Sequence, residues 1–152
     1  MKNYTSAVPV DRTISRIESI IAKFGAQNII KDYAGGEISS LSFVLGYEEG
    51  GRTKIVRIRV PAKVKEAEAV LRSRLKRSPS RMTLDRIHSQ GARTAWKVIQ
   101  DWIEVQLTLI ELHQAEPLQV FMPYICDGKK TLYELMRDSG FKMLPQGQQE
   151  DR

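Results

Sequence analysis

The sequence predicts a single α+β domain: an N-terminal helix, a three-stranded antiparallel meander, and then helices that include a long central amphipathic helix. Three observations predict this class. Apolar residues alternate along short runs separated by Gly-Gly turns, they repeat at helical spacing on either side of these runs, and 152 residues with 41% apolar content suffice for one sizeable core. We expect the domain to span residues 1–144 and the polar tail 145–152 to be disordered.

The first helix is expected to begin at Asp11 or Thr13, because either side chain can cap a helix. It ends before Gly25, which favours a left-handed C-terminal cap. One face of this helix is apolar and the other is charged, as in a helix that packs on a core. The apolar face consists of Ile14, Ile17, Ile20, Ile21 and Phe24.

Three β-like runs follow at residues 27–33, 38–47 and 53–60, with glycine-rich turns between them. The third run directs apolar side chains to one face of the sheet and Arg57 and Arg59 to the other. Antiparallel sheets commonly keep one face in water. Two interpretations of these arginines therefore stay open, a ligand-binding surface and a solvated sheet face.

A second helix is expected over residues 62–76, and Ser78-Pro79-Ser80 breaks it. The break lies inside a block of basic residues, so part of this block is a helix end and part is a connection. Arg72, Lys76 and Arg77 would also complement the dipole of this helix, which gives some of the charge a structural role.

The longest helix is expected to begin near Thr83 or Ala92 and to end at Leu112. Its apolar residues form two stripes on opposite sides, a pattern that an ordinary surface helix lacks. Either the helix is central, or one stripe faces a second copy of the chain. The first stripe consists of Trp96, Ile99, Ile103, Leu107 and Ile110, and the second of Val98, Trp102, Val105, Leu109 and Leu112. For a homodimer, the candidate interface is Trp96, Ile103 and Ile110, or the opposite stripe.

The C-terminal part begins with the apolar stretch 118–125, and Asp127-Gly128 then forms a turn. Thr131 and Glu134 have the spacing of a capping box. This spacing predicts a last short helix over residues 131–138.

The whole formal charge of the chain, +6, is contained in residues 72–93, where seven basic residues stand against Asp85. A local block of Arg and Lys on a balanced background is typical of proteins that bind phosphates or other anions. The alternative is a solvated connection, since like charges repel one another. The candidate anion-binding residues are Arg57, Arg59, Arg72, Arg74, Lys76, Arg77, Arg81, Arg86 and Arg93.

The sequence contains little that supports catalysis, and we expect neither an enzyme nor a cofactor. His88 and His113 lack the spacing of metal ligands, and Cys126 has no histidine near it in sequence to activate a nucleophile. The lone cysteine excludes an internal disulfide. Neither a signal peptide nor a run long enough to span a membrane is found, so we expect a cytoplasmic protein without a membrane partner.

Several segments resemble a set of small uncharacterised proteins encoded by bacteriophages and prophages. These segments are residues 8–13, 17–18, 24–26, 56–61, 93–97 with the run on to Leu112, 121–125 and 127–132, and the resemblance covers about residues 8–136. It rests on patterns of helix entry, strand and turn, and it implies a phage origin and the bacterial host cytoplasm rather than a particular activity.

Three functions are compatible with a phage origin and a basic block. The first is a nucleic-acid-binding accessory protein for replication, recombination or transcription, which contacts phosphates through the block. The second is an anti-defence inhibitor, similar in role to an anti-CRISPR protein, that binds an acidic host protein, its guide RNA channel or a signalling nucleotide. The third is an assembly partner whose long helix dimerises. Because residues 72–93 contain no aromatic residue, duplex backbone contact is favoured over base stacking.

Overall fold

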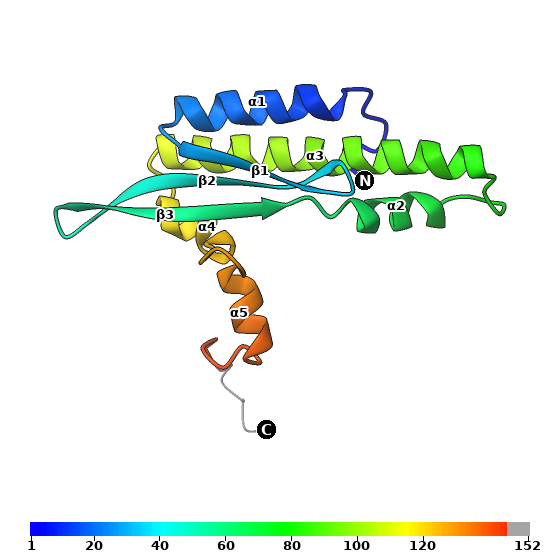
Figure 1. The fold of residues 1–152 in the computed structure, drawn as a ribbon. Coiled ribbons are helices and arrows are strands. Elements are labelled where there is room, and N and C mark those ends of the chain that lie inside the picture. The colour runs from blue at the N-terminus through cyan, green and yellow to red at the C-terminus, as the bar shows by residue number, and fades with distance from the viewer. Residues whose placement is uncertain (146–152) are drawn as a thin grey trace.

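The computed structural model describes residues 1–145 and has the predicted α+β class (Figure 1). The predicted tail lies outside the described residues from residue 146 onward. Helices α1 and α3 lie over one face of the sheet, and α5 lies on the other side (Figure 1). Along the chain the elements are α1 (Val10–Lys23), β1 (Gln27–Ala34), β2 (Glu37–Glu49), β3 (Arg52–Pro61), α2 (Val64–Ser73), α3 (Arg81–Glu111), α4 (Pro117–Phe121), the 3-10 helix η1 (Met122–Tyr124) and α5 (Leu132–Asp138).

The sheet is an antiparallel meander with the order β1-β2-β3, as predicted. Phe43 of β2 pairs with Ile58 of β3, and both side chains are buried against the helices. The turns at Gly35-Gly36 and Gly50-Gly51 have positive φ angles, which glycine adopts without steric cost. The alternation of apolar residues therefore predicted the strands, and on β3 it predicted the face that Val56, Ile58 and Val60 share.

The core lies between the sheet and the two helices that cover it. Its members come from α1, β2, β3, α3 and α4, so every major layer contributes to one apolar cluster. Burial of these side chains is the main stabilising contribution to the fold. The core residues are Ile14, Ile17, Ile21, Leu41, Phe43, Leu45, Ile58, Val60, Trp96, Ile103, Leu107 and Phe121.

The start of α1 differs from the prediction. The helix begins at Val10 after Pro9, and no side chain caps it. Thr13, one of the two predicted caps, is instead fully buried within the helix. Proline fixes φ near the helical value, so it starts the helix earlier than a side-chain cap would. Gly25 has φ of 100° just after the helix, as predicted.

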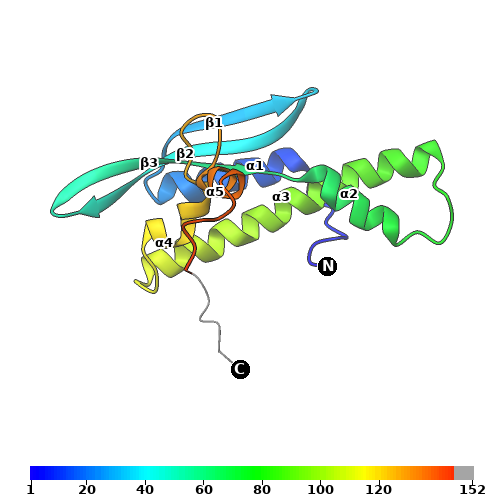
Figure 2. The ribbon, with the colours of Figure 1, turned by 90° about the horizontal axis from the view of Figure 1, so that it is seen from below.

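Helices α2 and α3 have different limits from those predicted. α2 ends at Ser73, three residues earlier, so that Lys76 and Arg77 lie in the connection rather than in the helix. α3 is one continuous helix of 31 residues that begins at Arg81, and the Ser80 hydroxyl caps it by accepting a hydrogen bond from the Thr83 N–H at 3.2 Å. Figure 2 shows that α3 runs along most of the length of the molecule.

The side chains of the first predicted dimer interface, Trp96, Ile103 and Ile110, lie inside the fold, so this part of the prediction is wrong. Trp96 and Ile103 are 1% and 0% exposed in the core, and Ile110 packs against the same core. These side chains fill the interior of their own chain and are not available to a second copy. The opposite stripe is more open, since Val105 and Leu112 are 56% and 61% exposed.

The C-terminal part packs against β3 and ends in the predicted helix. The Cys126 N–H donates to the Arg57 carbonyl at 2.9 Å, which continues the chain along the edge of β3. Thr131 and Glu134 form the predicted capping box at the start of α5. Among residues 1–145, no helix is both long and apolar enough to cross a bilayer.

Candidate functional site

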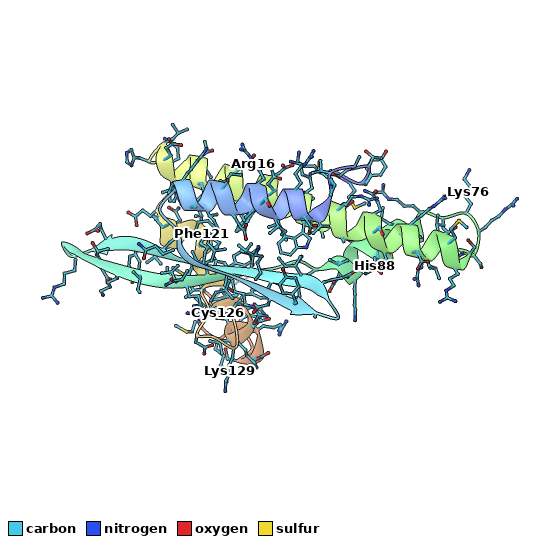
Figure 3. All side chains as sticks on the ribbon, turned by 45° about the horizontal axis from the view of Figure 1, so that its top comes forward. Arg16, Lys76, His88, Phe121, Cys126 and Lys129 are labelled. Carbon is cyan, nitrogen blue, oxygen red and sulfur yellow. The ribbon has the colours of Figure 1, made fainter. Side chains whose placement is uncertain are left out.

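The strongest concentration of charge lies at the end of the hairpin formed by α2 and α3. We call residues 72–86 the hairpin tip. It lies beyond the end of the sheet, and the side chain of Lys76 points away from the rest of the molecule (Figures 1 and 3). The structure brings together six of the nine predicted residues here: Arg72, Arg74, Lys76, Arg77, Arg81 and Arg86, all of them exposed.

Local contacts determine the course of the chain through the hairpin tip. The Leu75 N–H donates to the Arg72 carbonyl at 3.0 Å, which turns the chain out of α2. The Ser80 cap then starts α3. Behind the tip, α3 approaches α2 closely at Gly91, where an added Cβ would lie 2.8 Å from Cγ of Glu68. The cationic side chains are therefore attached to a defined helical hairpin.

The cations of the hairpin tip have no carboxylate partner in the described part of the chain. Within residues 1–145, none of the six takes part in an ion pair. Cations elsewhere do, as in the pairs Lys31–Glu18 at 2.7 Å and Lys97–Asp101 at 3.3 Å. Arg74 has a different contact, with its guanidinium 5.6 Å from the ring centre of Tyr4. The tip thus gathers positive charge that no ion pair within residues 1–145 neutralises.

Helix stability accounts for little of this charge. Arg72 lies in the last turn of α2, where a cation complements the helix dipole, but Lys76 and Arg77 lie beyond the helix. Arg81 occupies the first turn of α3, where a positive charge is unfavourable and where no acidic residue is present. The predicted structural role therefore holds for Arg72 and not for Lys76 and Arg77.

Arg93 lies outside the hairpin tip and has a structural role. Its Nε donates to the Ser6 carbonyl at 3.1 Å, and its Nη2 donates to Gln90 Oε1 at 2.7 Å. Arg93 is also only partly exposed. These contacts fasten the N-terminal segment to α3, so they give Arg93 a structural role that requires no external anion.

Arg57 and Arg59 lie on β3, and the structure does not bring them to the hairpin tip. Arg59 Nε donates to Ser40 Oγ at 3.3 Å and lies 3.9 Å from Asp32 Oδ2, while its Nη1 donates to the Lys129 carbonyl at 3.4 Å. Arg59 therefore links the sheet to the C-terminal part. Arg57 is exposed on β3, and α2 lies between this strand and the hairpin tip, so the two do not form one continuous patch (Figure 1).

Sequence reasoning missed a cluster around His88, because its members are far apart in the chain. Nε2 of His88 lies 2.7 Å and 2.9 Å from the two carboxylate oxygens of Glu37, and Nδ1 hydrogen-bonds Glu68. The two carboxylates approach different ring nitrogens, so they do not converge on one point as the ligands of a metal ion would. Among the described residues, no group of three or more suitable side chains is arranged to hold a metal.

Tyr4 is a second feature that sequence reasoning missed. The N-terminal segment, residues 1–9, runs beside α3, where Asn3 Nδ2 donates to Asp101 Oδ2 at 2.9 Å and the Thr94 hydroxyl donates to the Asn3 carbonyl at 3.1 Å. This path places Tyr4 against Arg74. The contact joins residues distant in sequence, and no local pattern predicts it.

No protein-family model, no curated protein and no solved structure matches this chain. The resemblance to phage-encoded proteins therefore stays a prediction, and the site is interpreted from its own geometry and charge.

Proposed function

We propose that the protein is a non-enzymatic nucleic-acid-binding accessory protein that contacts phosphates through the hairpin tip. One observation carries the proposal: six exposed cations gather on one helical hairpin without a carboxylate partner in residues 1–145. Their mutual repulsion is relieved when a polyanion binds and its counterions are released. The role that we propose lies in phage replication, recombination or transcription, functions that are compatible with the phage origin implied by the resemblance.

Contact with the backbone of a duplex fits this surface better than stacking on unpaired bases. The hairpin tip contains no aromatic residue, and Tyr4, the aromatic ring beside it, is in contact with Arg74. Proteins that bind single strands generally combine a positive groove with several aromatic platforms. We therefore expect binding that is largely independent of sequence and that weakens strongly with salt.

The test compares two variants that each remove four positive charges. The tip variant replaces Lys76, Arg77, Arg81 and Arg86 by Gln. The control variant replaces four other basic residues by Gln: Arg12, Lys23, Arg52 and Lys142. These four are exposed outside the tip and also lack ion pairs among residues 1–145. Fluorescence anisotropy with labelled DNA duplex, RNA duplex and single strand is measured across a salt series.

The tip variant should bind duplex much more weakly, and its plot of log K against log salt should be shallower by about 3 to 4, because each lost phosphate contact removes about 0.9 from the slope. The control variant should retain most of the slope of the native protein. Equal losses in both variants would mean that binding follows net charge and not the hairpin tip. Absence of duplex binding by the native protein at low salt would reject the proposal.

A second candidate function is inhibition of a host defence protein through the same surface. The observation that favours it is exposed apolar area among the cations, since Met82 is 65% exposed and Leu75 is exposed beside Lys76. Protein interfaces typically combine apolar side chains with arginine, whereas phosphate contacts need no apolar area. Replacing Met82 by Gln separates the two functions, because it should weaken binding to an acidic protein and leave duplex binding unchanged.

A further inference from the structure

A groove of about 730 Å³ lies between α3, the junction of β3 with α2, and the segment from η1 to α5. Its volume is in the range of small-molecule binding sites. Most of its wall is apolar or aromatic, and none of its lining residues belongs to the hairpin tip. The main wall residues are Val98, Ile99, Trp102, Pro123, Tyr124 and Tyr133.

The aromatic wall of the groove is anchored in the core. The Trp102 ring meets Phe121 edge-on, with centroids 5.7 Å apart and an angle of 85° between the rings, and it lies 5.0 Å from Tyr124. Phe121 is fully buried and meets Phe43 of β2 in the same edge-on manner at 6.0 Å. Such paired rings keep the wall in place, so the groove is formed before any ligand arrives.

The charge available at the groove is positive. Lys63, at the start of α2, is exposed and has no ion pair within residues 1–145. In the same part of the chain, Arg137 of α5 forms an ion pair with its exposed neighbour Asp138 alone, at 3.6 Å. Glu134 also lines the groove, but its carboxylate accepts the Thr131 N–H at 2.8 Å. This hydrogen bond is the main cause of the lowered pKa of Glu134. Glu134 therefore stays ionised, and the groove lining carries the two cations Lys63 and Arg137 against this one anion.

We propose that this groove binds a small apolar carboxylic acid. The apolar part of the ligand lies against Val98, Trp102 and Tyr124, and its carboxylate lies at the rim beside Lys63 and Arg137. Apolar walls with a few convergent polar groups are the usual composition of small-molecule sites, and a carboxylate complements the two cations. The proposal is independent of the nucleic-acid function, because it uses different residues.

The probe for the test is decanoate, compared with the neutral alcohol 1-decanol below the concentrations at which either aggregates. Trp102 lines the groove, whereas Trp96 is buried in the core, so a Trp102→Phe variant identifies the source of a change in fluorescence. We expect a saturable change in Trp102 emission with decanoate, and about tenfold weaker binding of decanol, because a charge-assisted hydrogen bond is lost.

Two pairs of variants locate the ligand. Val98→Glu places a carboxylate in the groove and should abolish decanoate binding, whereas Val105→Glu, on the same helix outside the groove, should not. The double variant K63Q/R137Q should lower decanoate affinity to that of decanol and leave decanol binding unchanged. Circular dichroism and thermal unfolding verify that each variant is folded.

Three results would overturn the proposal. They are the absence of a saturable decanoate signal, equal binding of decanoate and decanol by the native protein, and equal effects of Val98→Glu and Val105→Glu. Sedimentation that reveals a native dimer, dissociated by Val98→Glu alone, would assign the groove to a second copy of the chain instead. None of these results bears on binding at the hairpin tip, so the two proposals fail separately.

Discussion

At the scale of single residues, His88 connects three elements of the fold. It lies on α3, and its two ring nitrogens reach Glu68 of α2 and Glu37 at the start of β2. Hydrogen bonds that the ring donates to the carboxylate of Glu37, and next to that of Glu68, raise the pKa of His88. A protonated ring can donate to both carboxylates at once, whereas a neutral ring has one N–H and can donate to one of them. Protonation therefore strengthens the attachment of the hairpin to the sheet.

The raised pKa predicts how stability depends on pH. Because the folded pKa lies above the unfolded value of about 6.5, the stabilisation is fully present below about pH 6.5 and is lost as pH rises through the folded pKa. We expect a loss of about 0.5 to 1 kcal/mol in the free energy of unfolding, since these side chains are partly exposed. Urea denaturation at a series of pH values measures it.

His113 provides the control for this experiment, because it is exposed and follows α3 without a carboxylate partner among residues 1–145. His88→Gln should remove the loss of stability above pH 6.5, and His113→Asn should preserve it. If the native protein and His88→Gln showed the same dependence on pH, the ion pairs of His88 would contribute nothing to stability.

At the scale of elements, the cap of α3 determines both helix stability and the position of the basic side chains. Ser80→Ala removes the hydrogen bond to the Thr83 N–H and should lower the free energy of unfolding by about 0.5 to 2 kcal/mol. Ser80→Asp keeps a capping acceptor and adds a negative charge favourable to the helix dipole, so stability should be retained. The same charge lies among the cations of the hairpin tip and should weaken duplex binding.

Thermal unfolding and the duplex anisotropy assay together test this separation. Ser80→Asn caps the helix without adding charge, and it should match the native protein in both measurements. Unchanged duplex binding by Ser80→Asp would show that the start of α3 is not part of the binding surface.

Most elements of the fold could be predicted from local patterns, but their limits depend on tertiary contacts. Alternating apolar residues gave all three strands, and the spacing of Thr131 and Glu134 gave α5. Helix α3 begins at Arg81 after the Ser80 cap and continues through Gly91, where it packs closely on Glu68 of α2. The sequence left two starts open for this helix, near Thr83 and near Ala92. It likewise offered two stripes on α3 without indicating which one enters the core.

The candidate site could likewise be predicted from the sequence only in part. A run of basic residues close together in sequence stays together on a hairpin, and six of the nine predicted residues meet there. Arg59 and Arg93 could not be assigned from sequence, because their partners Asp32, Ser40 and Ser6 are brought to them only by the fold. The groove beside Trp102 was not predicted at all, since its walls come from four separate segments.

At the scale of the whole molecule, the N-terminal segment lies beside both the hairpin tip and the groove. Met1 lines the groove, and Tyr4 contacts Arg74 of the tip. Between them, Asp101 Oδ2 of α3 forms an ion pair with Lys2 Nζ at 3.0 Å and accepts a hydrogen bond from Asn3 Nδ2 at 2.9 Å. Burial acts to raise the pKa of Asp101, but the hydrogen bonds from Asn3, Lys2 and Lys97 outweigh it and lower the pKa. The segment is therefore fastened by polar contacts and does not belong to the apolar core.

Removal of residues 1–6 should leave the fold intact and lower the free energy of unfolding by about 1 to 3 kcal/mol, because several hydrogen bonds of about 0.5 to 1.5 kcal/mol each are lost. Decanoate binding should weaken, since the groove loses the wall formed by Met1. Duplex affinity should stay within about twofold, because the deletion removes a single cation, Lys2, which forms an ion pair with Asp101 and is not part of the hairpin tip. Urea denaturation and the two binding assays measure the three effects on one sample.

Asp101→Asn is the matched control for this deletion. It weakens the attachment of the segment but keeps Met1, so it should reproduce part of the loss of stability with a smaller loss of decanoate binding. A large loss of duplex affinity on deletion would instead make the N-terminal segment, through Tyr4, part of the nucleic-acid surface.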